Sequence, residues 1–551
     1  MEARRTHLWL AGAKITGVGT LVSRILGMLR DTATASLLGQ RGVMDAFVIA
    51  YRLPNLFRRL FGEGALTAGY LPVLTAQWER DPAAARRLAT VVLALLAVLL
   101  TVLVACGELL FGMIWWIWGD VPGVSLLMGL SAVMLPYLLL VCIAAQLTTM
   151  LHAVRHFTVP AITPIILNVI WLAAAWGVAY WVTTDQVVQA YILAVGVILA
   201  GIAQVVVQVP MLRRLGFHFD WDFSGTREGL RQILQNLAPM FVGLAVTQIN
   251  TFNDSLIAWL LASTDKELRP IPWLGEVVSY PMQQGAAAAL YYGERLYEFP
   301  VGIIGTAIAV AIFPLLTLHA FRDDRRLLAA DMTLGLQMVF CLSVPASVGL
   351  ILLAEPIARL LFEHGQFLQK DTLRAAKTIA WYATGVWAYC ASPVVVRGFY
   401  ALGDTATPVR LAAWMVGLNL LLNLTLIWPL AECGLALSTS ISAAVQTCLL
   451  AAIFSRRHAS LLWRQIAMTV LRTMAATAVM AVAVYVLARY LAQIEQLSFD
   501  TVTGSKRLAL CLLHVGLPIL LGMTVYGGVY RLLGGRELQM LFARHHEQAR
   551  E

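Results

Sequence analysis

The residues best suited to chemistry in this chain of 551 residues are charged side chains that lie inside apolar segments. They are concentrated between Ser23 and Pro72, a stretch apolar enough to cross a bilayer twice. The stretch carries Arg24, Arg30, Asp31, Asp45, Arg52, Arg58, Arg59 and Glu63. Charge within a membrane is costly, and arginines outnumber the three acids of the stretch. This surplus predicts a cationic site that binds an anion, water or both.

Helical spacing indicates which of these charges share a face. Arg24 and Asp31 are seven residues apart and fall on one face of the first helix, with Arg30 directed away from Arg24. Asp45 and Arg52 are also seven residues apart, so they form a stripe on the second helix.

Proline interrupts this stripe. Pro54 lies inside the second helix and can bend it. Arg59 continues the stripe of Arg52 if the helix is straight, whereas a bend lets Arg58 face the same cavity. The structural alternative is that Arg52 pairs with Asp45, or that Arg58 and Arg59 extend to the membrane interface.

A second part of the chain resembles the first. The segment from Arg52 (R-L-P-N-L-F, then L-P-V-L) is similar to that from Arg295 (R-L-Y-E-F-P, then F-P-L-L), and residues 151–160 are similar to residues 400–408. The offsets of the two matches, 243 and 248 residues, nearly agree. We therefore predict two related lobes of about six helices each, which in transporters bind substrate between them near the membrane midplane.

The repeat gives the arginine-rich stretch a counterpart in the second lobe. Arg295 lies there, with Glu298 one helical turn away, and the two side chains could simply pair with each other. Guanidinium groups remain charged and bind phosphate through two hydrogen bonds. Arginines from both lobes would suit a phosphate or pyrophosphate carried by a lipid.

Oxygen-bearing side chains in other apolar segments form a second candidate site. They are Asp254, Asn419, Asn423 and Thr439. Carboxylate, amide and hydroxyl oxygens could bind a hard cation such as Na⁺. Hydrogen bonding between helices and proton coupling at Asp254 are the alternatives.

The elements that must position these residues are membrane helices. The chain is 59% hydrophobic and 13% charged, with a mean hydropathy of +0.75, whereas soluble domains carry about 25% charged residues. We predict an all-α polytopic membrane protein with about 14 transmembrane helices. They cover residues 14–39, 44–77, 88–118, 123–152, 159–182, 186–212, 229–262, 284–319, 328–354, 371–401, 407–429, 434–456, 463–492 and 506–533.

Loop charges predict the orientation and the domains. The net charge of +9 resides mostly in alternate loops, around residues such as Arg86, Arg213 and Arg325. Positive loops face the cytoplasm, which places both termini there and leaves a nucleic-acid role unsupported. The predicted domains are an N-terminal lobe (1–220), a C-terminal lobe (221–458), two extra helices (459–534) and a cytoplasmic tail (535–551).

Signals for an enzyme are weak. The sequence lacks a P-loop, a Ser/His/Asp arrangement and a G-x-G-x-x-G motif after a strand. Glu363 and His364 are too few for a metal site, so no metal is predicted. The seven cysteines lie mainly in apolar runs and are expected to be small buried side chains.

The sequence resembles the bacterial MurJ/MviN lipid II flippases of the MOP exporter superfamily. The motifs that carry the resemblance are S-R-I-L-G…R-D from Ser23, D-A-F from Asp45, L-P-N-L-F-R-R from Leu53, E-G-A from Glu63, Y-Y…R-L…E-F-P from Tyr291 and F-E-H-G-Q-F from Phe362. The likeness extends over nearly the whole chain. It implies a fold of 14 helices in which two lobes surround a cationic cavity and the last two helices line a groove for the lipid tail.

The resemblance also implies roles for individual residues. Arg24, Arg30, Arg58, Arg295 and Asn55 match positions that bind the pyrophosphate or headgroup. Asp31, Asp45, Arg52 and Glu298 are expected to orient these side chains or gate the cavity.

The expected function is alternating-access transfer of lipid II from the inner to the outer leaflet of the bacterial cytoplasmic membrane. We expect a monomer that uses no cofactor and is driven by Na⁺, H⁺ or the membrane potential. An interaction with cell-wall synthesis proteins is left open.

A flippase for another polyprenyl-linked glycan would need the same arginines, whereas a MATE-type cation exporter would concentrate acids in its cavity. A membrane glycosyl- or phosphotransferase would need an acidic metal or nucleophile motif, and a scaffold would need no arginine in the membrane.

Overall fold

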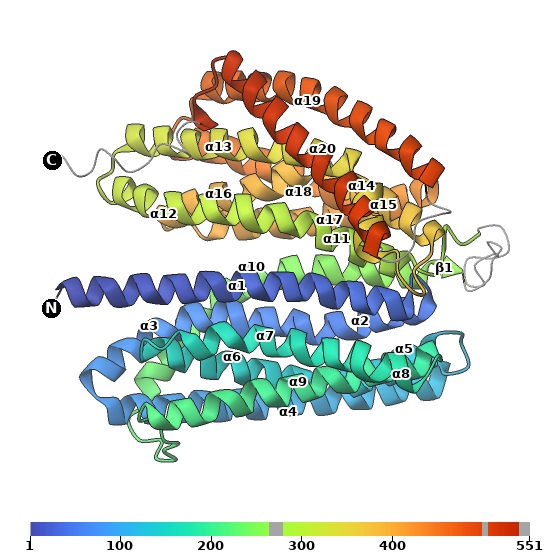
Figure 1. Cartoon of the computed structure of the whole chain (residues 1–551). Coiled ribbons are helices and arrows are strands. Elements are labelled where there is room, and N and C mark those ends of the chain that lie inside the picture. The colour runs from blue at the N-terminus through green and yellow to red at the C-terminus, as the bar shows by residue number, and fades with distance from the viewer. Residues whose placement is uncertain (1, 264–278, 499–504, 539–551) are drawn as a thin grey trace. The chain divides into compact units, whose positions relative to one another are not determined.

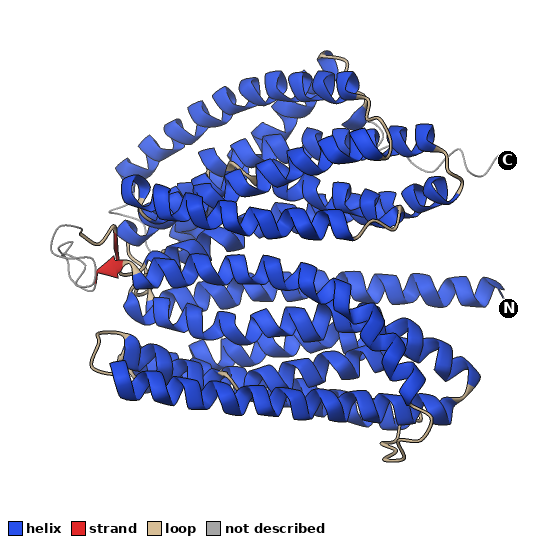
Figure 2. Ribbon diagram, turned by 180° about the vertical axis from the view of Figure 1, so that it is seen from behind, coloured by secondary structure: helices blue, strands red, loops and turns tan. Residues whose placement is uncertain are grey.

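The computed structural model describes residues 2–263, 279–498 and 505–538 (Figure 1), and the side chains of residues 16–61, 69–235, 248–263, 279–493 and 509–538. The Glu63 side chain and residues 539–551 of the expected tail lie outside these ranges. The described chain is almost entirely helical (Figure 2). Two short strands, β1 (Ala262–Ser263) and β2 (Met282–Gln283), pair in parallel.

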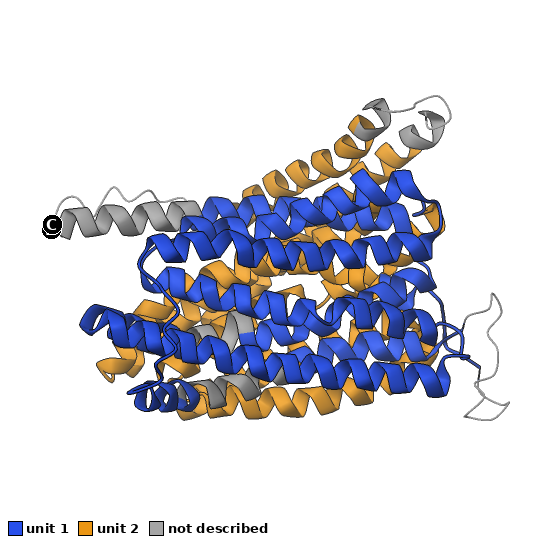
Figure 3. Ribbon diagram, turned by 90° about the horizontal axis from the view of Figure 1, so that it is seen from below, with its two compact units in different colours: residues 1–288, 364–367 blue, residues 289–363, 368–551 orange. Residues whose placement is uncertain are grey.

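The chain divides into two compact units (Figure 3), residues 1–288 with 364–367 and residues 289–363 with 368–551. The helices of unit 1 are α1 (Glu2–Leu38), α2 (Gly42–Phe57), η1 (Arg58–Gly64), α3 (Ala65–Arg80), α4 (Pro82–Trp118), α5 (Val124–Met134), α6 (Tyr137–Ala153), α7 (Thr158–Leu172), η2 (Ala173–Ala179), α8 (Tyr180–Val182), α9 (Gln186–Arg214) and α10 (Arg227–Leu260). Helix α11 (Ala286–Pro300) begins at the end of unit 1 and continues in unit 2. The further helices of unit 2 are η4 (Val301–Gly305), α12 (Thr306–Phe321), α13 (Arg325–Leu352), α14 (Ala354–Phe362), α15 (Gln369–Ala383), α16 (Val386–Ala401), α17 (Ala406–Leu430), α18 (Glu432–Arg457), α19 (Trp463–Ser498) and α20 (Ser505–Leu532).

The helices coincide with the predicted segments. Among the described residues, 10 helices are long and apolar enough to cross a membrane, or 11 if α15 and α16, bent by 41°, form one span. The difference from the predicted 14 falls on α1, on α2 with α3, and on α10. Each of these segments includes side chains outside the described ranges (residues 1–15, 62–68 and 236–247), so the number of 14 spans remains a prediction.

The unit boundary differs from the predicted domain boundary. Helix α10 packs along α2 and α3 in unit 1, although the sequence assigns it to the lobe of residues 221–458. Helix α10 is thus grouped with the first helices of the chain, although it follows the 215–226 linker. The boundary at residue 220, which follows from the sequence repeat, remains a prediction.

Each unit has its own apolar core. In unit 1 the core lies where α3, α4 and α6 meet, around Tyr70, Leu88 and Leu147. In unit 2 it lies among α12, α13, α16 and α18, around Leu316, Met332 and Phe399. The outward face of α4 is apolar and exposed, as expected for a surface covered by lipid tails.

Two of the seven cysteines contradict the expectation of burial. Cys142, Cys341 and Cys390 are buried, but Cys106 and Cys448 are exposed. An apolar side chain on the outer face of a membrane helix meets lipid, so the apolar runs around Cys106 and Cys448 did not require burial.

The repeat predicted from sequence recurs in the backbone. A π-helical turn begins at Arg58 in one half and at Val301 in the other, at the offset of 243 residues. At the same offset, the Asp81 carboxylate accepts the Ala84 amide (3.2 Å) and the Asp324 carboxylate accepts the Leu327 amide (3.0 Å). Both aspartates cap the N-terminus of the helix that follows.

The second match also recurs in detail. The His156 amide donates to the Leu151 carbonyl (2.9 Å), and the Asp404 amide, 248 residues later, donates to the Phe399 carbonyl (3.0 Å). The preceding residue has a positive φ in both places, 61° at Arg155 and 76° at Gly403. These are equivalent helix C-caps. The two halves of the chain thus share local backbone geometry as well as motifs.

Candidate functional site

Arg30 is held in a built environment on α1. It is 9% exposed, and its Nε and Nη2 donate to Oδ1 of Asp31 at 3.0 and 2.9 Å. Its Nη1 donates to Oδ1 of Asn168 on α7 (3.3 Å), and its guanidinium lies 4.9 Å from the ring centroid of Trp171. The charge is therefore compensated by a carboxylate, an amide oxygen and an aromatic face.

Helix α7 supplies the residues that the sequence reading missed. Asn168 also donates to the Ser23 carbonyl (3.0 Å), and the Trp171 indole donates to Oγ1 of Thr34 (3.0 Å). Asn168 is a single amide within the apolar run P-I-I-L-N-V-I. An isolated amide in a membrane helix was the available signal, because such groups require partners.

Arg24 differs from Arg30. Its side chain is exposed, and within the described part of the chain it makes no hydrogen bond or ion pair. The sequence places Arg24 and Asp31 on one face, but the observed partner of Asp31 is its neighbour Arg30. Unit 1 thus presents one compensated, buried arginine and one exposed arginine on the same helix.

The π-helical turn separates the arginines that follow Pro54. Arg58 Nε donates to Oδ1 of Asn55 (3.0 Å), and Asn55 in turn donates to the Tyr51 carbonyl (3.0 Å). These two hydrogen bonds connect Arg58 to Asn55 and Asn55 to Tyr51, toward the N-terminus of α2. The predicted binding pair Asn55 and Arg58 is brought together by one turn of helix.

Arg52 and Arg59 reach α10 instead. Arg52 Nη1 donates to the Thr251 carbonyl (3.1 Å), and Arg59 Nη1 donates to Oε1 of Gln248 (3.4 Å). Arg52 and Arg59 are seven residues apart, and both side chains lie on the side of the α2–α3 segment that faces α10. These bonds connect α10 to the charged stretch.

Asp45 caps the start of α11. Its Oδ2 accepts the Gly285 amide (2.6 Å) and its Oδ1 accepts the Ala288 amide (2.8 Å). A carboxylate at a helix N-terminus satisfies unpaired amides and complements the helix dipole. These two bonds go to backbone, and a role of Asp45 in orienting arginines remains a prediction.

Arg295 and Glu298 pair in unit 2. Arg295 Nη1 lies 2.9 Å from Oε2 of Glu298, and the guanidinium lies 4.7 Å from the Tyr291 ring centroid. Both side chains are partly exposed, at 28% and 39%. The stacked, paired arginine resembles Arg30 in its chemistry, with an acid and an aromatic ring as neighbours.

The segment Glu363–Phe367 makes a close backbone contact. The Gln366 amide donates to the Ser36 carbonyl at the end of α1 (2.8 Å). Gly365 has a φ of 57°, and a Cβ at this position would lie 2.3 Å from the Ser36 oxygen. Glycine is required here for both reasons.

Three of the four candidate cation residues form a hydrogen-bonded set in unit 2. Asn423 donates to Asn419 (2.9 Å), Asn419 donates to Thr439 (3.3 Å), and the Ser438 hydroxyl donates to Asn423. These bonds match the structural alternative, hydrogen bonding between helices. Asp254 lies in unit 1, where it is 2% exposed, and a cation site made by all four residues remains a prediction.

No cluster of three His, Cys, Asp or Glu residues suited to a metal occurs among the described residues. The arginine and amide groups described above offer recognition through hydrogen bonds and charge. Such groups bind anionic, phosphate-bearing molecules.

Comparison with known proteins places the chain among transporters. A sequence model of the family described as "Lipid II flippase MurJ" matches residues 34–499. The "Probable lipid II flippase MurJ" of Rhizobium meliloti (strain 1021) is 31% identical over 543 residues, which cover 95% of this chain and 94% of the relative. That of Vibrio cholerae is 32% identical over 452 residues, covering 79% and 81%.

Solved structures agree on the fold. A structure described as "Lipid II flippase MurJ, inward closed conformation" aligns with a TM-score of 0.71 at 21% identity, covering 95% of this chain and 99% of that chain. An inward-facing multidrug resistance MATE family transporter of the MOP superfamily aligns with a TM-score of 0.63 at 14% identity, covering 80% and 98%. At these identities the structural likeness concerns the fold alone.

Proposed function

The chain belongs to the lipid II flippase MurJ family, and from this we propose that it moves lipid II from the inner to the outer leaflet of the bacterial cytoplasmic membrane for cell wall synthesis. The observation that carries the proposal is the family match over residues 34–499, together with relatives named for this activity that align along 95% of the chain. As a family of flippases, it comprises transporters rather than enzymes. The apolar helices make this chain a multi-pass membrane protein.

The proposed binding groups are arginines that can grip a pyrophosphate. Arg24 is exposed on α1, Arg58 lies beside Asn55 on the π-helical turn, and Arg295 is partly exposed in unit 2. Each guanidinium can offer two parallel hydrogen bonds to phosphate oxygens. Glu298 is proposed to orient Arg295, since the two already pair.

Arg30 is proposed to act on the substrate indirectly. Its charge is already compensated by Asp31, and its side chain is buried against Trp171. We propose that it contributes positive potential and holds α1 against α7, with direct contact to the headgroup left to Arg24. A buried charge that loses its partner is costly, so this pair also restrains the helix.

The transport cycle proposed is alternating access, with the headgroup entering from the cytoplasmic side and leaving outside. The lipid tail is proposed to follow the last two helices, and the termini to lie in the cytoplasm as the basic loops suggest. Na⁺ or H⁺ at Asp254, or the membrane potential, is the proposed driving force, with no other cofactor. One charge that crosses 100 mV supplies about 2.3 kcal/mol. The chain is proposed to act as a monomer, with cell-wall synthesis proteins as neighbours.

The test is reconstitution of the purified protein in vesicles that carry lipid II with a fluorescent headgroup. We expect headgroup label to appear on the opposite leaflet, with lipid II recovered chemically intact. Transfer of another polyprenyl-linked glycan at an equal rate would make the substrate class broader than lipid II. Chemical conversion of lipid II without transfer would contradict the proposal.

A further inference from the structure

The linker between α9 and α10 (residues 215–226) is a part of unit 1 that the proposed function does not use. Its sequence alternates aromatic and polar residues, F-H-F-D-W-D-F. The first aromatic residue, Phe217, is buried and stacks on Trp78 with ring centroids 4.3 Å apart. The next three are exposed by 44%, 69% and 52%: Phe219, Trp221 and Phe223. Three adjacent exposed aromatic side chains indicate a surface that contacts a partner.

The linker is held in place by α4. The Asp220 amide donates to Oγ1 of Thr90 (3.0 Å), and Arg87 Nη1 donates to Oδ2 of Asp222 (3.0 Å). The exposed rings are therefore presented by a fixed backbone.

The two acids of the linker accept hydrogen bonds from the linker itself and, at Asp222, from Arg87 of α4. The Ser224 amide and hydroxyl, followed by Arg87, hold the pKa of Asp222 below its ordinary value. Asp220 accepts the Asp222 amide (3.1 Å). With its lowered pKa, Asp222 is charged, and its ion pair with Arg87 offsets that charge.

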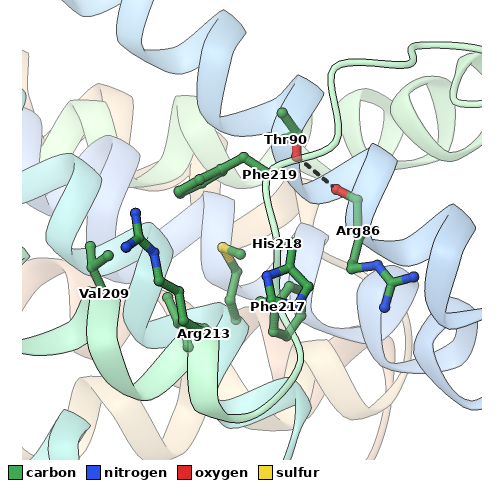
Figure 4. A pocket seen from close by; sticks show the side chains of 9 residues that line it. Arg86, Thr90, Val209, Arg213, Phe217, His218 and Phe219 are labelled. Carbon is green, nitrogen blue, oxygen red and sulfur yellow. Dashed lines mark hydrogen bonds between the residues drawn. The ribbon is translucent and has the colours of Figure 1, made fainter.

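A pocket beside the linker is lined by both cationic and apolar side chains (Figure 4). Arg86 at the start of α4 and Arg213 at the end of α9 line it, together with His218. Arg86 also donates to the Gly216 carbonyl (3.4 Å). The apolar lining includes Met150, Val209, Leu212 and Phe217. Guanidinium groups next to apolar side chains suit a lipid phosphate and the first carbons of its acyl chains.

The place of the linker on unit 1 identifies the partner. It lies beside the ends of α4 and α9, displaced to the side of the helices rather than beyond their ends (Figures 1 and 2). The apolar lipid-facing side of α4 begins at Leu95, eight residues after Arg87. The Asp220 amide is bonded to Thr90, and the five helical residues from Thr90 to Leu95 correspond to about 7.5 Å, so this part of the linker lies at the depth of the lipid headgroups. Tryptophan and phenylalanine with arginine are suited to that layer.

We propose that the 215–226 linker is an interfacial anchor that inserts Phe219, Trp221 and Phe223 into the cytoplasmic leaflet, while Arg86 and Arg213 bind the phosphate of an anionic phospholipid. The anchor rests on the membrane orientation given under the proposed function and is independent of lipid II. It fixes the depth of unit 1 in the bilayer through α4 and α9.

The first test measures the environment of Trp221. Full-length protein and the variant Trp221→Phe are reconstituted in vesicles of phosphatidylglycerol and phosphatidylethanolamine, and the difference between their emission spectra reports Trp221. We expect lipids brominated near the headgroup end of the acyl chain to quench this difference and aqueous iodide to leave it unchanged. Quenching by iodide but not by brominated lipid would place the linker in water and overturn the proposal.

The second test measures the phosphate contact by titrating short-chain phosphatidylglycerol into protein in neutral detergent. We expect Arg86→Gln with Arg213→Gln to weaken binding by roughly tenfold or more, from the loss of two cationic contacts. The matched control is Arg322→Gln with Arg326→Gln, two exposed arginines at the end of α12 and the start of α13. Equal loss in both double variants, or equal binding of phosphatidylcholine, would refute a phosphate site.

The two proposals fail separately. Lipid quenching of Trp221 in a protein that transfers no lipid II would leave the anchor and remove the flippase function. Lipid II transfer by a protein whose Trp221 is quenched by iodide would support the flippase function and overturn the anchor.

Discussion

The Arg30 guanidinium lies 2.9 Å from the carboxylate of Asp31, its neighbour in sequence. Successive helical residues point about 100° apart, so the contact depends on the arginine side chain curving back along α1. Trp171 and Asn168 on α7 occupy the other sides of the guanidinium. The pair is therefore part of the packing of α1 against α7.

Asp31→Asn is expected to destabilise the protein by about 2 kcal/mol, because it leaves a buried guanidinium without its counter-charge. The measurement is the thermal midpoint of the purified protein in detergent. Asp120→Asn, in an exposed turn, is the matched control and should leave the midpoint unchanged. An equal effect of the two changes would mean that the pair at Arg30 contributes nothing beyond surface charge.

Arg24→Ala is expected to slow lipid II transfer by about tenfold or more, because a charge-assisted bond to phosphate is lost. Its thermal midpoint should match wild type, since the side chain is exposed and makes no hydrogen bond within the described residues. Arg24→Lys should recover part of the rate through its charge. Arg295→Ala should show a similar loss of transfer, and normal rates in both alanine variants would remove these arginines from substrate binding.

Gly365→Ala is expected to detach residues 364–367 from α1. The added Cβ would lie 2.3 Å from the Ser36 oxygen, and φ is 57°. Hydrogen exchange should show loss of protection at the Gln366 amide, which donates to Ser36. Gly349→Ala, in a helix with open space around the new methyl group, is the control and should leave this amide protected. Unchanged protection in Gly365→Ala would show that the loop accommodates a side chain.

Gly403→Ala is expected to cost about 1 kcal/mol from backbone strain alone, because φ is 76° and no atom lies within 4 Å of the added Cβ. Gly417→Ala, inside α17 and equally unobstructed, should be neutral or stabilising. The difference between the two thermal midpoints measures how much glycine at position 403 stabilises this helix C-cap. Arg155 occupies the equivalent position in the first half of the chain. Equal midpoints for the two variants would argue against a strained cap.

The sequence was informative wherever local pattern determines structure. Hydropathy placed the helices, and the R-L…P-L motifs located two segments that both contain a π-helical turn at the same offset. Pairings across helices were not accessible, because Asn168 is 138 residues from Arg30 and only packing brings them together. Helical spacing predicted that Asp31 shares a face with Arg24. A helical wheel shows the direction of each side chain but not how far a long arginine side chain can reach, so it did not predict the pair with Arg30.

Asp404 provides a test of stability against pH. It follows α16 outside the membrane helices, where burial favours the neutral carboxyl but the Thr407 amide and hydroxyl and His458 outweigh it, so the pKa lies below its ordinary value of 3.8. The Thr407 hydroxyl is 2.7 Å from Oδ2. A depressed pKa means that the folded state prefers the charged form, so its stabilisation is complete well above pH 3.8 and is lost as the pH falls through the lower folded value.

Wild type should therefore be more stable than Asp404→Asn at pH 7, and this difference should shrink below about pH 4. The measurement is the difference in thermal midpoint between the two proteins at each pH, which cancels the titration of other carboxylates. Thr407→Val removes the hydroxyl donor while leaving the backbone amide, so it should reproduce part of the loss at pH 7. A difference that grows as the pH falls would mean that burial, which disfavours the charge, outweighs the hydrogen bonds at Asp404.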